Sequence, residues 1–227
     1  MNETSAPRRL RRDAAENRAG ILAAASQTLA ADPHASVDQI ARAAGLSRRA
    51  LYGHFDDRTA LVRELIAAGA QRFNAIAARV DDADSRIALA RLTATLWHEA
   101  ALVQVAAAIA LDEAHVEETA AALAPLRRVL AAIVRRGQDA DELRADMAAP
   151  TLARLIEESA RTVVTRTDAS SPAAADIAVR AVLSIAGLSW RETDALLAAH
   201  PDLLAPREAG GSRADTLATI PAEEDHA

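Results

Sequence analysis

The sequence predicts an all-α fold, with a small three-helix unit at the N-terminus and a larger helical domain after it. Three observations support this prediction. Hydrophobic residues make up 51% of the 227 residues but aromatic residues only 2%, so aliphatic side chains must fill the core. Alanine and leucine, the main packing residues, are strong helix formers. Apolar residues recur every three or four positions, and capping residues, glycines and prolines separate these stretches.

The first predicted helix runs from Leu10 to Ala31. It ends at Asp32-Pro33 because a residue that precedes proline is driven out of the helical region. Residues 1–9 are expected to form a disordered basic arm. Its arginines, together with those at the helix start, could reach into a DNA minor groove, although charged N-termini are usually only solvated. These arginines are Arg8, Arg9, Arg11 and Arg12.

The stretch from Ser36 to Leu61 predicts a helix-turn-helix. Ser36 can cap a short helix while Gln39, three positions on, reaches back to the N–H of the cap. Gly45 suits the sharp turn that follows because a residue without Cβ adopts a left-handed conformation at no steric cost. Ser47 then caps a second short helix, and the second helix of such a motif can enter a DNA major groove.

Within this stretch the sequence resembles the DNA-binding signature of the TetR family of transcriptional regulators. The resemblance covers about the first third of the chain and fixes about a dozen positions in one ungapped block. The matching residues are Ile40, Ala41, Ala44, Gly45, Leu46, Ser47, Leu51, Tyr52, His54, Phe55, Arg58 and Leu61. Two departures are Arg58, where the family usually has lysine, and Leu29, where an aromatic residue is common.

Candidate DNA contacts cluster in and around the second short helix. Arg48 and Arg49 can each pair with guanine O6 and N7, and Ala50 can meet a thymine methyl group. The alternative is that both arginines contact phosphate only or are solvated. The resemblance implies phosphate contacts for four further residues, for which capping or core packing is the alternative. These residues are Ser36, Ser47, Tyr52 and His54, and Arg58 at the start of the next helix fits a phosphate contact as well.

The domains expected from these patterns are a helix-turn-helix domain at 10–60, a helical ligand-binding and dimerisation domain at 61–205 and a mobile tail at 206–227. Asp57 can cap a long helix that reaches Val80 and links the two domains. The helix after it, from Arg86, is apolar on several faces and should be central. Further helices are expected at 113–123, 125–136, 151–167 and 172–188, where Ser171-Pro172 would cap the start. Ser189 and Glu192 predict another capping box, for a short helix that ends at His200-Pro201.

The larger domain shows no set of residues typical of catalysis, so we expect no enzyme, no cofactor and no metal. The acidic cluster at Asp112, Glu113, His115, Glu117 and Glu118 favours a solvated helix start over a metal site. A ligand pocket between the helices is more plausible, because helical bundles host ligands among apolar walls with a few polar groups. The weak candidates for it, for which ordinary core packing is the alternative, are Phe73, Trp97, His98 and Gln104.

The helices at 151–167 and 172–188 combine an apolar stripe with small residues. Paired with the same helices of a second copy, they would form a four-helix interface. The small residues are Ser159, Ala160, Ala178, Ala181 and Ala186. The resemblance to TetR-type regulators implies such a homodimer, an inducer pocket in the larger domain and, most often, repression.

The net charge is −6, and all 26 basic residues are arginine. Residues 1–60 carry +2 and residues 61–227 carry −8, which favours an orientation with the N-terminal unit facing DNA. The chain has no cysteine, and neither a secretory signal nor an apolar run of membrane-spanning length is present, so we expect a soluble cytoplasmic protein without a membrane partner.

The sequence therefore predicts a ligand-responsive, sequence-specific DNA-binding transcriptional regulator. It would act as a repressor and bind a palindromic double-stranded operator as a homodimer, under the control of an unidentified small molecule. A ligand-independent DNA-binding or architectural protein is the main alternative. A small-molecule enzyme on a helical scaffold is the least favoured alternative, because no nucleophile, base or metal set supports it.

Overall fold

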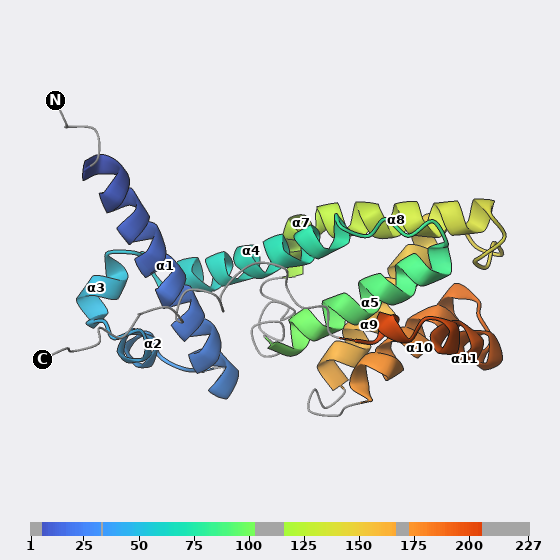
Figure 1. Cartoon of the computed structure of the whole chain (residues 1–227). Helices are drawn as coiled ribbons and strands as arrows, with labels where there is room; N and C mark the ends of the chain where they lie inside the picture. The colour runs from blue at the N-terminus through green and yellow to red at the C-terminus, as the bar shows by residue number, and fades with distance from the viewer. Residues whose placement is uncertain (1–5, 33, 103–115, 167–172, 206–227) are drawn as a thin grey trace, which may run out of the picture.

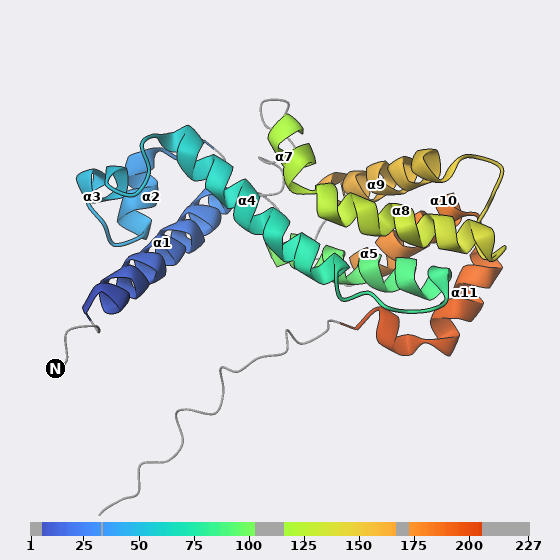
Figure 2. The ribbon, with the colours of Figure 1, turned by 90° about the horizontal axis from the view of Figure 1, so that it is seen from above.

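The computed structural model describes residues 6–32, 34–102, 116–166 and 173–205, and every regular element within them is helical, as predicted. Figures 1 and 2 show α1, α2 and α3 gathered at one end of the molecule, with α4 running from them to the remaining helices. The helices are α1 (Ala6–Ala31), α2 (Val37–Ala43), α3 (Arg48–Tyr52), α4 (Arg58–Ala77), α5 (Ser85–Leu102), α7 (Val116–Ala122), α8 (Ala124–Asp139), α9 (Ala149–Arg166), α10 (Ala174–Ala186), α11 (Trp190–Ala199) and the 3-10 helix η2 (Pro201–Leu203).

The N-terminal unit has its own hydrophobic core. Helices α1, α2 and α3 and the first turn of α4 each contribute to it, so the predicted three-helix unit is closed by the start of a fourth helix. Its fully buried side chains come from all four helices and the adjoining loops. They are Ile21, Ala25, Leu29, Ala35, Ile40, Ala41, Leu51, Phe55 and Leu61.

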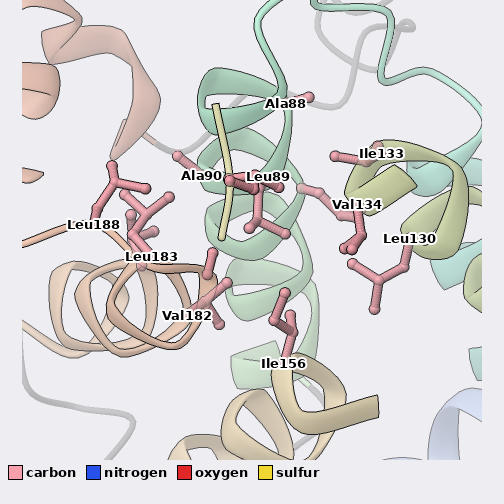
Figure 3. Close-up of a cluster of buried hydrophobic side chains, with 14 of the residues drawn as sticks. Ala88, Leu89, Ala90, Leu130, Ile133, Val134, Ile156, Val182, Leu183 and Leu188 are labelled. Carbon is pink, nitrogen blue, oxygen red and sulfur yellow. The ribbon is translucent and has the colours of Figure 1, made fainter. Parts of the chain in front are cut away.

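Helix α5 lies at the centre of the larger domain, as its several apolar faces predict. It packs against α4, α8, α9 and α10. Figure 3 shows Leu89 of α5 with Val134 of α8 on one side and Leu183 of α10 on the other. All three side chains are fully buried. Each such side chain contributes about 1.5–3 kcal/mol of hydrophobic free energy, so this layer is the main source of stability in the domain.

Several helix bounds differ from those expected. Helix α1 begins at Ala6 and not at Leu10, with Pro7 in its first turn, where proline is well tolerated. The side chains of the basic arm and the tail at 206–227 lie outside the described residues. Helix α4 ends at Ala77, before Val80. Helix α10 begins at Ala174 with Ala173 at its N-cap and no side-chain cap, and the expected cap at Ser171-Pro172 lies outside the described residues.

The end of α10 is set by a glycine that the sequence reasoning missed. Gly187 adopts the left-handed conformation with φ of +111°. The Leu188 N–H donates to the Leu183 carbonyl over 3.0 Å, and the Gly187 N–H donates to the Ser184 carbonyl over 3.1 Å. These two bonds form a Schellman motif, which ends the helix at Ala186 and not at the expected Leu188.

Gly187→Ala should lower the free energy of unfolding by at least about 1–2 kcal/mol, because an alanine would be strained at this φ. Its Cβ would also lie 2.8 Å from Arg144 Cβ. Chemical denaturation measures the loss. Gly20→Ala is the matched control: Gly20 is exposed on α1, and an added Cβ would meet no heavy atom within 4 Å, so stability should stay equal or rise by about 0.5–1 kcal/mol. Equal effects of the two substitutions would contradict this account.

Candidate DNA-binding surface and interior cavity

The turn between α2 and α3 has the geometry that the sequence predicts. The Ser36 hydroxyl accepts from the Gln39 N–H over 3.3 Å, and Gln39 Oε1 accepts from the Ser36 N–H over 2.7 Å, which completes the capping box. Gly45 has φ of +70°, and the Ser47 hydroxyl caps α3 by accepting from the Ala50 N–H over 3.2 Å. Each short helix is thus stabilised at its own start.

One face of α3 is fixed in the core and the other is open to solvent. Leu51 is fully buried, and Phe55, in the loop that follows α3, is 3% exposed. Burial of these two side chains holds the five-residue helix against α1 and α2. Among the candidate DNA contacts, the exposed ones are Ser36, Ser47, Arg48, Arg49, Ala50 and Tyr52, and the half-buried ones are His54 and Arg58.

The two candidate base-reading arginines differ in their surroundings. Arg48 Nη1 lies 3.3 Å from Asp38 Oδ2 of α2, and its guanidinium lies 5.5 Å from the centre of the Tyr52 ring. A hydrogen bond to Tyr52 and the charge of Asp38 raise the pKa of Arg48. Arg49 forms no ion pair with any residue that the structure describes. Arg49 can therefore reach a base or a phosphate directly, whereas Arg48 must first leave Asp38.

Arg18 of α1 connects three parts of the structure, and the sequence reasoning gave it no role. Its Nε donates to Glu64 Oε1 of α4 over 2.5 Å, its Nη2 also bonds Glu64, and its Nη1 donates to the His54 carbonyl over 2.8 Å. The guanidinium carbon lies 4.4 Å from the centre of the Phe55 ring. Its hydrogen bonds to Glu64 raise the pKa of Arg18. The loop that follows α3 is thereby tied to both α1 and α4.

A partly open cavity of about 600 Å³ lies between α1, α4, α5, α7, α8, α9 and α10. Two predicted pocket residues, Phe73 of α4 and Trp97 of α5, lie in its wall. His98 is not among the residues that line this cavity, and its Nε2 lies 3.2 Å from the Leu204 carbonyl oxygen, toward the C-terminal segment. Gln104 lies outside the described residues. Leu22 of α1 and Leu65 of α4 line the cavity and also pack against the core of the N-terminal unit.

The arginines in the cavity wall have carboxylate partners. Arg72 Nε lies 2.9 Å from Glu99 Oε1. Arg127 Nε lies 3.0 and 2.9 Å from the two oxygens of Glu157, and its Nη2 donates to Oε1 over 2.6 Å. Arg161 Nη2 lies 3.9 Å from Glu157. The charges of these walls are therefore largely compensated within the protein.

Helices α9 and α10 lie side by side at the end of the molecule away from α1–α3 (Figures 1 and 2). Leu155 of α9 is 43% exposed and Ile177 of α10 is 44% exposed. Two of the small residues expected at a dimer interface serve another purpose: Ala178 and Ala186 are buried within the protomer. The exposed apolar side chains, and not these alanines, mark the candidate dimer face.

The described residues contain no group of three or more His, Asp or Glu side chains that could hold a metal ion. Asp112, Glu113 and His115 of the acidic cluster lie outside them, while Glu117 and Glu118 lie in the first turn of α7. No described helix combines the length and the apolar character that a membrane span requires.

Comparison with known proteins identifies the N-terminal unit. Residues 21–65 match the family model for bacterial regulatory proteins of the tetR family. The TetR resemblance drawn from the sequence is thereby confirmed, and its matched segment spans the helix-turn-helix and the start of α4. A comparison with curated protein sequences finds no significant match.

Several solved structures share the fold of the chain. The TetR-family regulator PfmR from Thermus thermophilus is 22% identical, with a TM-score of 0.64 over 74% of this chain and 98% of its own. FadR from Bacillus subtilis, solved with stearoyl-CoA, is 15% identical, with a TM-score of 0.63 over 74% and 97%. RolR, solved with resorcinol, is 15% identical, with a TM-score of 0.54 over 82% and 94%.

Arg18→Ala should lower the free energy of unfolding by about 1 kcal/mol, because it removes bonds to Glu64 and His54 from a site that is only partly shielded from solvent. Arg18→Lys should lower the free energy of unfolding by a similar amount, since the ammonium group of lysine cannot make the same set of hydrogen bonds as the planar guanidinium. Thermal unfolding followed by circular dichroism tests both variants. Arg42→Ala, at an exposed position of α2, should change stability by less than about 0.5 kcal/mol. Wild-type stability in Arg18→Ala would show that the connection contributes nothing.

Proposed function

We propose that this chain, whose residues 21–65 carry the DNA-binding domain of the tetR family, is a ligand-responsive, sequence-specific transcriptional regulator. It binds a palindromic operator as a homodimer and acts as a repressor. The observation that carries the proposal is the joint position of α1 and α4. Both helices support the helix-turn-helix through Leu22 and Leu65, and the same two side chains line the cavity.

DNA recognition falls to the exposed face of α3. Arg49 and Arg48 lie in the first turn of this helix, where side chains of a recognition helix meet base edges. Ser36 and Ser47 lie at helix N-termini, where free N–H groups favour a phosphate oxygen. Tyr52, His54 and Arg58 extend the same segment and would contact the backbone. The +2 charge of residues 1–60 orients this end toward DNA.

Dimerisation supplies the affinity and the specificity that one short recognition helix lacks. A five-residue helix reads only a few base pairs, so affinity and specificity require two half-sites about one helical turn apart or a multiple of it. Leu155 and Ile177 offer an exposed apolar surface on two neighbouring helices. A twofold axis beside α9 and α10 would bury these side chains in a four-helix interface.

The cavity supplies the switch. A ligand that fills it contacts α4 along Ile66, Gly69 and Phe73, on the helix whose first turn closes the core of the DNA-binding unit. A displacement of α4 changes the separation of the two recognition helices in the dimer. The ligand shifts the equilibrium only by the difference between its affinities for the two arrangements, so it must fit the non-binding arrangement better.

Arg49→Ala should reduce affinity for the operator about tenfold or more, because one good arginine–guanine contact contributes about 1–3 kcal/mol of discrimination. Arg48→Ala should also weaken binding and relax preference at one base pair. Selection from a random DNA library, followed by titration of the chosen site and of scrambled DNA, measures both effects. Loss of equal size on operator and scrambled DNA would reassign the residue to phosphate contact. Selection of no palindrome at all would favour a ligand-independent architectural protein.

Leu155→Glu combined with Ile177→Glu should convert the dimer into a monomer, since two carboxylates would have to be desolvated in the apolar interface of each protomer. Sedimentation equilibrium measures the molecular mass, and operator affinity should fall with it. Ala195→Glu, at an exposed position of α11, provides the matched control and should leave the dimer intact. A double variant that remains dimeric would place the interface elsewhere.

A further inference from the structure

The walls of the cavity are mostly apolar. Helices from both ends of the molecule contribute aliphatic or aromatic side chains to it, among them Leu22, Leu65, Phe73, Leu92, Trp97 and Leu126. A cavity of about 600 Å³ falls within the range that holds a drug-sized molecule. Transfer of apolar surface from water into such walls is favourable in proportion to the area buried, so the bulk of a ligand here must be apolar.

The charged groups of the wall do not offer a vacant site for an anion. Arg127 is held by both oxygens of Glu157, and Arg72 is held by Glu99. A ligand carboxylate would have to displace Glu157 from Arg127, or else enter beside an existing carboxylate. Either course costs desolvation energy, and the lost ion pair offsets the gain from the new one.

One buried polar group of the wall lacks a partner. The indole N–H of Trp97 has no hydrogen-bond acceptor among the residues that the structure describes, although the side chain is only 5% exposed. Trp97 lies in the cavity wall, so a molecule bound in the cavity is placed to supply the missing acceptor.

The Thr93 hydroxyl, one turn away on α5, already donates its proton to the Leu89 carbonyl over 2.8 Å, so it has no proton left for a ligand oxygen. Buried indole N–H groups usually find a partner, and an unpaired one costs free energy. A ligand oxygen that accepts from Trp97 would remove that cost. It would also fix the orientation of an otherwise apolar molecule.

We propose that the effector of this cavity is an uncharged, predominantly apolar molecule with one hydrogen-bond acceptor, such as a ketone or ester oxygen, that receives the Trp97 indole N–H. The proposal rests on the proposed function, since it names the ligand class of the same cavity. Anionic amphiphiles are the competing class, and the pairing of Arg72 and Arg127 with carboxylates disfavours them.

The test uses three probes of equal shape. 2-Undecanone carries a carbonyl acceptor and no charge. In decanoate, a carboxylate oxygen replaces the methyl group that is bonded to this carbonyl. In 2-methylundec-1-ene, a methylene group replaces the carbonyl oxygen. Trp190→Phe makes Trp97 the sole tryptophan of the full-length chain, because the sequence contains two. Trp190 is 64% exposed on α11, so this substitution leaves the core untouched. Fluorescence of Trp97 then reports occupancy of the cavity directly.

2-Undecanone should bind at least about tenfold more tightly than decanoate. It should bind about three- to tenfold more tightly than the alkene, because the net free energy of one hydrogen bond corresponds to an affinity ratio of that size. Trp97→Phe, measured by calorimetry, should remove the preference for the ketone over the alkene, because the ratio of the two affinities isolates the hydrogen bond from the loss of apolar contact that both probes share. Decanoate binding as tightly as the ketone, or no binding by any of the three probes, would overturn the proposal.

Glu157→Gln supplies the complementary test. It removes the carboxylate that holds Arg127, so the preference should move toward decanoate by about tenfold or more. An unchanged preference would show that ion pairing does not select the ligand. Operator titration with bound 2-undecanone separates this proposal from the proposed function. Ketone binding without any change in operator affinity would leave the ligand class standing and reject the ligand-responsive switch.

Discussion

The structure depends on side chains that belong both to the core under the helix-turn-helix and to the wall of the cavity. Leu22 of α1 and Leu65 of α4 pack under the helix-turn-helix and also face the cavity, so the DNA-binding core and the cavity cannot be repacked independently. Protein interiors are close-packed, and a ligand that moves one of these leucines must move its neighbours in the other site. The coupling between a ligand and DNA binding therefore needs no long pathway through the domain. It needs only a second stable position for α1 and α4.

Polar contacts make α4 respond as one body. At its N-terminal half, Glu64 bonds Arg18, and Arg63 lies 2.8 Å from Glu118 of α7. At its C-terminal half, the Asn74 side chain donates to the Ala122 carbonyl over 2.9 Å and accepts from the Leu126 N–H over 3.0 Å. These contacts fix the helix to α1, α7 and α8 along its length. In the proposed switch, a displacement of α4 would reach the loop after α3 through Arg18, whose third bond goes to the His54 carbonyl.

Local structure was predictable from the sequence because its determinants lie within a few residues of one another. The capping boxes at Ser36 and Ser189, the turn at Gly45 and the cap at Asp57 all form as expected. Contacts between distant segments were not predictable, because no short-range pattern marks them. Arg18 and Glu64 are 46 positions apart, and His98 meets Leu204 across 106 positions. The contact of His98 with Leu204 and the role of Arg18 were both missed for this reason.

The pairing state of each arginine, and not the number of arginines, decides its use. Every basic residue of the chain is arginine, so residue type cannot distinguish a DNA contact from a structural ion pair. Arg49 is exposed and has no carboxylate partner among the described residues, whereas the half-buried Arg127 forms an ion pair with Glu157. The Arg48–Asp38 pair lies between these extremes: both side chains are well exposed, and exposed pairs contribute little. In the proposed function DNA recruits Arg48 at small cost, while a ligand anion that recruits Arg127 must first break its paired hydrogen bonds to Glu157 in a mostly apolar wall.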